Sequence, residues 1–257
     1  MNHFVFNGVS SDEMGVRIEK YPDIPKPKKR MSQIVVPGRD DPLRQWDGTY
    51  EPVTVRYQCW FKAETDDPHD SVANRAHQIA EWLGSAPAGA ELSDTYDPLV
   101  YRRATYIGGA DFRNIVNRYG KFDVVFECDP RCFLESGRDI GVDVGSPVVL
   151  SNVTTHLSKP VITVTCAGSG NVIFRQRQGE TILKTYTIGI RYPDQLPHTA
   201  TIDCDIEEAW GPVNGVIQSL FPWIYTDEFP VVAPGQVEIE VTGGITDARI
   251  DLRWWTL

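Results

Sequence analysis

Two segments of the chain alternate apolar and polar side chains so regularly that each fits a strand with one buried face. In residues 52–61, PVTVRYQCWF, one side carries Val53, Val55, Tyr57, Cys59 and Phe61. In residues 121–128, KFDVVFEC, the corresponding side carries Phe122, Val124, Phe126 and Cys128. Because successive side chains of a strand point to opposite faces, this period predicts two half-buried antiparallel strands.

A single helix is predicted between these strands. Its apolar stripe consists of Val72, Ala76, Ile79, Ala80 and Leu83, which recur at the spacing of one helix face. Asp70 or Ser71 is expected to cap its first turn, and Gly84 to end it. One helix over one face of a sheet predicts an α+β domain in residues 1–135.

The second half of the chain has the pattern of an all-β domain. Residues 136–147, SGRDIGVDVGSP, hold three glycines and no useful period, so they are the predicted linker. In residues 148–257 we expect a β-sandwich. It should contain a hairpin turn at residues 167–171, AGSGN, and a second hairpin that turns at Gly243-Gly244. The predicted fold class is mainly β, with an N-terminal α+β domain followed by a sandwich.

No targeting or membrane segment is evident in the sequence. The start, MNHFVFNGVSSDE, lacks the basic and apolar regions of a secretory signal, and no apolar run has the roughly 18 residues of a membrane helix. Five cysteines, an odd number, argue against a disulfide framework. Cys128 and Cys132 lack further ligands at zinc spacing. We therefore expect assembly in a cytoplasm, no membrane insertion, no metal and no cofactor.

The net charge of −10 is concentrated late in the sequence. Residues 199–257 contain ten acidic residues against only Arg249 and Arg253. A protein that grips nucleic acid shows the opposite sign. The one basic cluster, KPKKR at residues 26–30, lies among prolines and is interpreted as a solvated loop.

Two polar clusters resemble catalytic groups but are better explained otherwise. Arg39, Asp40 and Asp41 follow Pro37-Gly38, and aspartate in such a place ordinarily bonds nearby turn amides. In residues 202–210, IDCDIEEAW, the carboxylates match neither a glycosidase pair nor an EF-hand loop. We expect Asp203 and Asp205 on the outer face of a strand, opposite Ile202, Cys204 and Ile206. With no nucleophile, phosphate or zinc-protease motif present, the sequence predicts no catalytic residue and no enzyme.

The second half of the chain is rich in aromatic residues. Trp254 falls on the buried register of its predicted strand, whereas Trp255 points to the other side. An aromatic face stacks on the apolar face of a sugar, so Trp255 is a candidate contact for a glycan or a partner, although packing is the preferred interpretation.

Short segments at both ends of the chain carry a family resemblance. They are FVFNGVSSDEMGV at residues 4–16, VPGRDD at residues 36–41, and FPVVAPGQVEIEVTGG at residues 229–244, which leads to an RW pair. In their order and spacing, these segments resemble the distal tail (Dit) proteins of long non-contractile, siphovirus-type bacteriophage tails. Two departures are Asp41, where members often have glycine, and Gln236, near which they often have asparagine.

The resemblance implies a structural virion protein. Six copies would form a ring through a β-barrel-like N-terminal sheet and a belt loop at about residues 21–43, and a galectin-like sandwich would project outward. The ring would join the tail tube and tape-measure proteins to the tail-tip or baseplate hub and receptor-binding proteins, and DNA would pass transiently through its channel. By position, the interface residues would be Lys26, Lys28, Lys29, Arg30, Arg39, Asp40 and Asp41. An acidic lumen would repel phosphates and let DNA pass without sticking.

Two alternatives stay open at this point. The first is a glycan-binding β-sandwich module for attachment to a cell surface. The second is a tail-associated hydrolase that uses Asp203 and Glu207.

Overall fold

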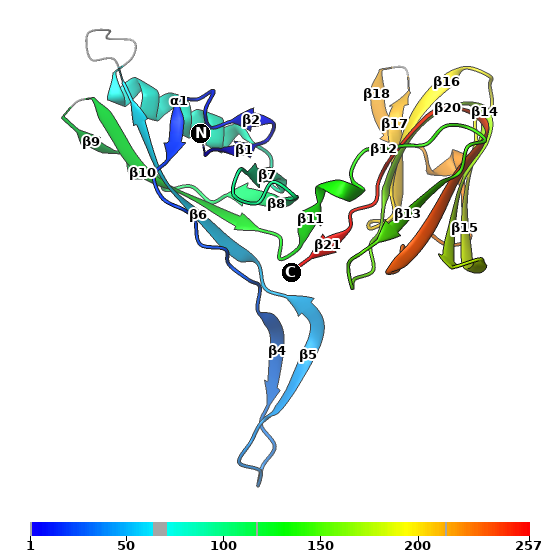
Figure 1. Cartoon of the computed structure of the whole chain (residues 1–257), viewed down its shortest axis with the longest axis horizontal. Helices are drawn as coiled ribbons and strands as arrows, with labels where there is room; N and C mark the ends of the chain where they lie inside the picture. The colour runs from blue at the N-terminus through cyan, green and yellow to red at the C-terminus, as the bar shows by residue number, and fades with distance from the viewer. Residues whose placement is uncertain (1, 64–70, 117, 214) are drawn as a thin grey trace. The chain divides into compact units, whose positions relative to one another are not determined.

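The computed structural model describes residues 2–63, 71–116, 118–213 and 215–257, which divide into two compact units (Figure 1). Unit 1 ends at Cys132 but also includes Leu257, and unit 2 is Phe133–Thr256. The domain boundary was expected at residue 135. The predicted linker lies inside unit 2, where its strand β12 (Ile140–Gly141) pairs with β20 (Gly235–Asp251).

Unit 1 is built on one antiparallel sheet. Its strands follow the order β2 (Val9–Ser10), β1 (Phe4–Phe6), β7 (Ala90–Asp94), β8 (Val100–Tyr106), β10 (Tyr119–Cys128), β6 (Val53–Lys62) and β3 (Val16–Ile18), and β9 (Arg113–Ile115) pairs with β10. Strands β6 and β10 pair along their whole lengths, with Cys59 opposite Phe122. All nine apolar residues predicted to share the inner faces of these two strands are buried, so the strand prediction is confirmed.

The predicted helix is α1 (Val72–Ser85), which packs Ile79 and Leu83 fully buried against the sheet core. Ser71 caps it by accepting a hydrogen bond from the Asn74 amide at 3.2 Å, while Asp70 lies outside the described residues. No helix in the described part of the chain is long and apolar enough to cross a membrane.

Two details of the helix prediction are wrong. Gly84 lies inside the helix and does not end it. The helix stops one residue later because Pro87 disfavours helical geometry in Ala86, which is extended. Ala80 is exposed, and the partly buried Trp82 packs on the core instead, because a large ring reaches the sheet from the edge of the stripe.

Unit 2 is organised around two long strands, β14 (Val161–Gln178) and β20. The other strands of this sheet, besides β12, are β13 (Val148–Asn152), β15 (Thr181–Arg191), β16 (Pro197–Asp203), β17 (Glu208–Val213), β18 (Val216–Ser219) and β19 (Ile224–Tyr225). Two short strands outside this sheet, β11 (Cys132–Leu134) and β21 (Trp255–Thr256), pair with each other. One half of β14 pairs with β16, and the other half pairs with β15. The two long strands therefore serve both halves of the unit, whose core includes Ile162, Phe174 and Ile239.

Both hairpins predicted in unit 2 are wrong, because their glycines bend two continuous strands instead of reversing them. The ladder between β14 and β20 jumps from Cys166 opposite Ile245 to Gly170 opposite Gly243. Gly243 has a φ of +81°, and a Cβ on Gly244 would lie 2.0 Å from the Ala167 carbonyl oxygen. Glycine is needed here for close backbone approach within a bulge, and a bulge is one of the ways in which a strand turns from one sheet layer into another. We call residues 166–170 of β14 and 243–245 of β20 the glycine corner.

We predict that Gly244→Ala destabilises unit 2 by roughly 3 kcal/mol, because the added methyl group cannot fit beside the Ala167 oxygen without breaking the ladder. Urea unfolding measures the change. Gly141→Ala is the matched control, since a Cβ at Gly141 meets nothing within 4 Å and its φ is not positive. Equal midpoints for the two variants would contradict this role of the corner.

We also predict that Gly84→Ala stabilises unit 1 by about 0.5–1 kcal/mol, because alanine loses less backbone entropy than glycine inside a helix. A Cβ at this position meets nothing within 4 Å. Thermal unfolding followed by circular dichroism tests the change, and a lower melting temperature would contradict it.

Candidate assembly interface

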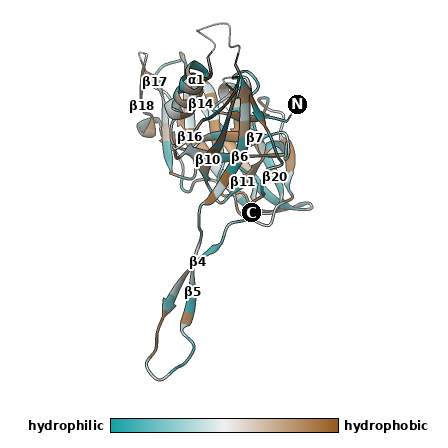
Figure 2. Cartoon of the chain, turned by 90° about the vertical axis from the view of Figure 1, so that its left-hand side faces the viewer, coloured by the Kyte–Doolittle hydropathy of each residue, from teal (hydrophilic) through white to brown (hydrophobic). Residues whose placement is uncertain are grey.

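Strands β4 (Lys29–Ile34) and β5 (Leu43–Tyr50) of unit 1 form a two-stranded sheet of their own. We call residues 29–50 the arm. Figure 2 shows it as a narrow ribbon beyond the end of β6, with hydrophobic and hydrophilic residues interspersed. Its second strand continues seven residues past Leu43, where the sequence-based belt ended.

The tip of the arm is a turn set by Pro37 and Gly38. The Arg39 amide donates to the Val36 carbonyl at 3.1 Å, and Gly38 has a φ of +81°. Proline before a glycine of positive φ is the pattern of a type II turn. The turn expected from the sequence is confirmed, and it joins two antiparallel strands.

Near its base the arm has a bulge built around Asp47. The ladder shifts between Lys29 and Met31, and Gly48 has a φ of +90°. The Asp47 carboxylate accepts hydrogen bonds from both the hydroxyl and the amide of Thr49, at 2.7 and 2.8 Å. These bonds hold the pKa of Asp47 below its usual range, chiefly through the hydroxyl.

Trp46 is fixed beside this bulge. Its indole nitrogen donates to the Thr49 carbonyl at 2.8 Å, the Lys29 ammonium lies 4.5 Å from its ring centroid, and the Tyr50 ring packs edge-on at 5.6 Å. These contacts orient the indole, yet 41% of Trp46 stays exposed. An oriented aromatic side chain is a common anchor of protein interfaces.

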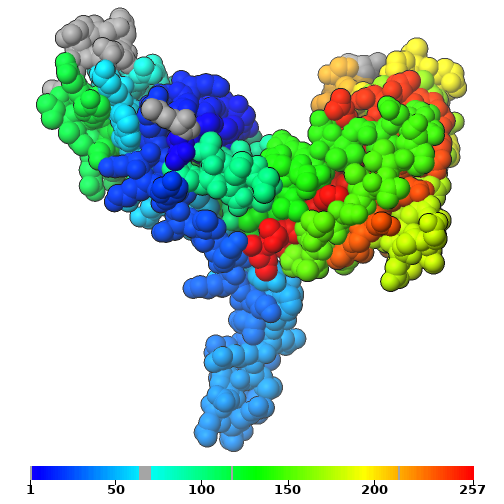
Figure 3. Space-filling view, viewed as in Figure 1, coloured from blue at the N-terminus to red at the C-terminus, as the bar shows by residue number. Residues whose placement is uncertain are grey.

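The arm has no core of its own. Apolar residues are exposed on and between its strands: Met31, Ile34, Val35, Val36, Leu43 and Trp46, at 36–80%. Figure 3 shows the arm standing clear of the body of unit 1. An isolated two-stranded hairpin is marginally stable in water, and both of its strands offer unpaired edge groups. The arm therefore has the composition and geometry of a segment that packs on another surface.

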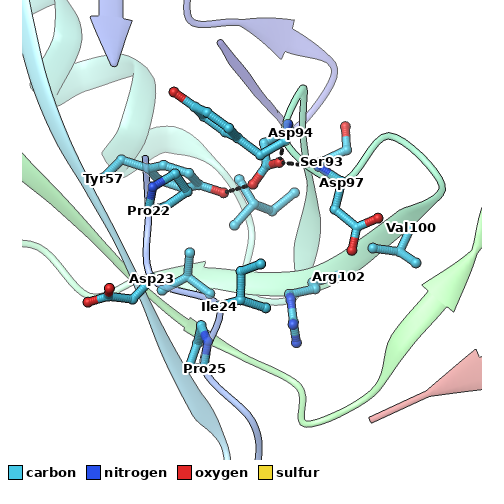
Figure 4. Close-up of a pocket in the computed structure, with 13 residues that line it drawn as sticks. Pro22, Asp23, Ile24, Pro25, Tyr57, Ser93, Asp94, Asp97, Val100 and Arg102 are labelled. Carbon is cyan, nitrogen blue, oxygen red and sulfur yellow. Dashed lines mark hydrogen bonds between the residues drawn. The ribbon is translucent and has the colours of Figure 1, made fainter. Parts of the chain in front are cut away.

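The segment that leads into the arm is seated on the sheet of unit 1. Residues 22–25 cover a small cavity of about 50 Å³ whose walls include Tyr57 and Asp94 (Figure 4). The buried Tyr57 hydroxyl donates to the Asp94 carboxylate at 2.6 Å, and burial is the main cause that raises the pKa of Tyr57. Lys26 donates to the Leu257 oxygen at 2.8 Å. This seat fixes the base of the arm.

The seven charged residues expected at the interface are all exposed. Lys26, Lys28, Lys29 and Arg30 lie at the base of the arm, whereas Arg39, Asp40 and Asp41 lie at its tip. With a rise of about 3.3 Å per residue, the two groups are separated by roughly 20 Å. The seven residues therefore form two separate charged groups, one at the base of the arm and one at its tip, and do not form a single patch.

Residues considered for other roles have structural partners. The Asp203 carboxylate pairs with both terminal nitrogens of Arg253 at 2.7–2.8 Å and is 7% exposed. Asp203 is the last residue of β16 and alternates with the buried Ile202, as predicted, although the pairing with Arg253 buries it. The predicted continuation of the strand through Asp205 and Ile206 is wrong, because β16 ends at Asp203 and the chain then turns through Glu207, whose φ is +57°. The same turn leaves Ile206 exposed.

Trp255, the candidate glycan contact, is partly buried. Its ring stacks on His156 with centroids 3.8 Å apart, and its indole nitrogen donates to the Leu157 carbonyl at 2.9 Å. Trp254 is buried, as its register predicted. All five cysteines are buried free thiols, and burial raises the pKa of Cys128 to about 12.

Two solved structures share the fold of this chain over nearly its full length. The Dit (gp 19.1) protein of phage SPP1, described as a hub of the adsorption apparatus in phages that infect Gram-positive bacteria, superposes with a TM-score of 0.56 at 14% identity, and the match covers 98% of both chains. This chain has the fold of the SPP1 Dit protein. A chain of the phage P2 baseplate, in its activated conformation with calcium, gives a TM-score of 0.60 at 7% identity over 97% of both chains.

No protein-family model matches the sequence, and no curated protein matches it. The likeness to the two phage proteins therefore lies in the fold, at identities too low for a sequence comparison to find.

Sequence reasoning missed the second strand of the arm and its apolar content. A signal was present, because KRMSQI and LRQWDGTY flank a segment that contains Pro37-Gly38. The polar residues of the turn are typical of an irregular loop, so the sequence predicted a belt loop for this segment. The exposed apolar residues became visible only when the structure showed that nothing in the described part of unit 1 covers them.

We predict that Asp47 titrates below its usual pKa and that Thr49→Val raises this pKa, because the variant loses the hydroxyl donor but keeps the amide. A lowered pKa in the folded arm means that the bulge gains stability above the ordinary pKa and loses it as the pH falls through the lowered value. Carbon-13 NMR titration of the carboxyl group measures both pKa values, and equal values would contradict the proposed cause.

Proposed function

We propose that this chain is the distal hub of a phage tail, in which six copies form a ring and the arm of each copy packs on its neighbour. The observation that carries the proposal is the exposed apolar arm, which lacks a core of its own and whose base is held by the Lys26–Leu257 hydrogen bond. The shared fold with an adsorption-apparatus hub and a baseplate chain supports the same role.

A repeated contact between arm and body satisfies the geometry of a closed ring. In a ring, each subunit presents two different complementary patches, one to each neighbour. The arm supplies the first patch, and the body of unit 1 supplies the second. The charged groups at the base and tip set the register of this contact more than its affinity.

The partners of the ring follow from its position in a tail. We propose that one side binds the tail-tube and tape-measure proteins and the other binds the tail-tip or baseplate proteins, including receptor-binding proteins. The ring is part of the virion and is assembled in the host cytoplasm. No catalytic step is needed for this role.

The passage of DNA requires a channel wall that does not hold phosphate. Residues 1–132 contain 17 basic and 20 acidic residues, so the proposed ring unit is close to neutral, and the acidic surplus lies in unit 2. On the outer face of its sheet, Arg56 pairs with Asp123 and Lys121 with Glu19. Paired charges of both signs present no net cationic surface to DNA.

We predict that the wild-type chain forms particles of six times the mass of one chain, with a central hole in negative-stain images. The double variant Ile34→Asp, Leu43→Asp changes two residues that face each other across the arm. Each apolar side chain buried in an interface contributes about 1.5–3 kcal/mol, so the variant should weaken assembly at least about 100-fold. Light scattering after size exclusion measures the loss.

Leu183→Asp is the matched control, because Leu183 is 60% exposed in unit 2 and its change should leave the ring intact. The melting temperature of the double variant should equal that of the dissociated wild type, since the changed residues are not in a core. A chain that stays monomeric both alone and with tail-tube and tip proteins would refute the hub. An arm variant that assembles like the wild type would refute the role of the arm.

A further inference from the structure

One face of unit 2 carries a polar hollow of about 420 Å³ that no part of the proposed hub function uses. It lies on a row of residues that are paired across neighbouring strands: Thr242 of β20, Asn171 of β14, Gly189 of β15 and Tyr225 of β19. Residues paired directly across strands place their side chains on the same face of the sheet. The row therefore sets an amide on one side of a glycine and a phenol ring on the other.

Gly189 forms the floor of the hollow. The glycine has no side chain, which leaves room for the guanidinium of Arg191 beside Asn171 and keeps Gly189 itself buried. Its φ is not positive, and thus the backbone does not require glycine at this position. A Cβ built on Gly189 would lie 3.2 Å from the guanidinium of Arg191, which shows that Arg191 folds back over the glycine.

Arg191 is held in place before any ligand arrives. Its Nη1 donates to the Gly170 and Ile190 carbonyls at 2.9 and 2.8 Å, and its Nη2 donates to the Asn171 side-chain oxygen at 3.0 Å. A guanidinium has five N–H donors, so two remain beyond the bonds found among the described residues. A side chain fixed in this way loses little conformational freedom when it binds a ligand.

The opposite wall presents an aromatic ring and a carboxylate. Tyr225 is 58% exposed, and Asp227 follows two residues later at the rim, while Thr187 adds a hydroxyl on the side of β15. The hollow thus combines donors from Arg191, an acceptor at Asp227 and an exposed ring. One cation and one carboxylate balance its formal charge.

We propose that this hollow binds a neutral saccharide, with one pyranose ring seated between Arg191 and Tyr225. A pyranose has C–H groups on its face and hydroxyl groups around its edge. The C–H groups suit the negative face of the Tyr225 ring, and the hydroxyls suit Arg191, Asn171 and Asp227.

A charged sugar fits the site less well because Arg191 and Asp227 would attract and repel either sign about equally. The site is shallow, and for a monosaccharide we expect a dissociation constant on the order of 1 mM. Several copies in one assembly would raise the effective affinity for a repeating glycan. The proposed site differs from Trp255, whose indole nitrogen and ring face already have partners in unit 2.

The test uses the full-length chain and saturation-transfer NMR with the methyl glycosides of glucose, galactose, rhamnose and N-acetylglucosamine. Methyl glucuronide serves as the anionic probe. We expect binding of at least one neutral glycoside and at least a tenfold loss of affinity in Tyr225→Ala. Gly189→Ala should cause a similar loss, because its methyl group displaces the Arg191 guanidinium from its place in the hollow, and the strand should fold since only the flexible end of Arg191 must move.

Phe221→Ala is the matched control, because Phe221 is an aromatic residue of unit 2 with a similar exposure of 49%. Its affinity should equal that of the wild type. The proposal is overturned if no neutral glycoside binds, if only the glucuronide binds, or if Tyr225→Ala and Phe221→Ala behave alike. The mass of the assembly reports the hub function separately, because Tyr225 and Gly189 lie in unit 2 whereas the arm lies in unit 1.

Discussion

The arm of unit 1 is constrained by a simple fact about sheets: two strands alone cannot bury both of their faces. Every larger sheet in this chain gains a core from a helix or from its other half, but the arm keeps Ile34, Leu43 and Trp46 in contact with water. Short-range hydrogen bonds set the backbone conformation of the arm at the Asp47 bulge and the type II turn, but they do not bury its apolar side chains. A segment with a defined shape and no core is complete only when a partner supplies the missing layer.

The alternation of apolar and polar side chains predicted the long strands of unit 1 correctly, because each of these strands has one buried face and one solvent-exposed face. Burial of Val55, Tyr57 and Phe126 followed directly from that period. Glycines were harder to interpret. Gly243-Gly244 has the signature of a hairpin turn, but the same two residues also permit a bulge at which one strand crosses closely over another. The choice depends on whether a distant strand, here β14, lies against them, and local sequence does not contain that information.

The candidate sites show the same division between local and distant information. The charged residues near the arm were identified from their position in a family pattern, and the turn at Pro37-Gly38 from local chemistry. The apolar residues on the arm were missed because Ile34 and Leu43 look like the ends of ordinary strands until the structure shows no layer beneath them. The hollow on unit 2 was missed for a similar reason, since Asn171, Gly189 and Tyr225 come together only through the pairing of three strands.

The glycine corner also affects how unit 2 responds to thermal fluctuations. Strands β14 and β20 run through both halves of the unit, so the two halves share backbone hydrogen bonds and have no seam along which one could open alone. Amide protons in the two halves should therefore exchange with solvent at similar rates, limited by one global opening. Those of the arm should exchange far faster in a free subunit. A partner that covers the arm would remove most of that difference.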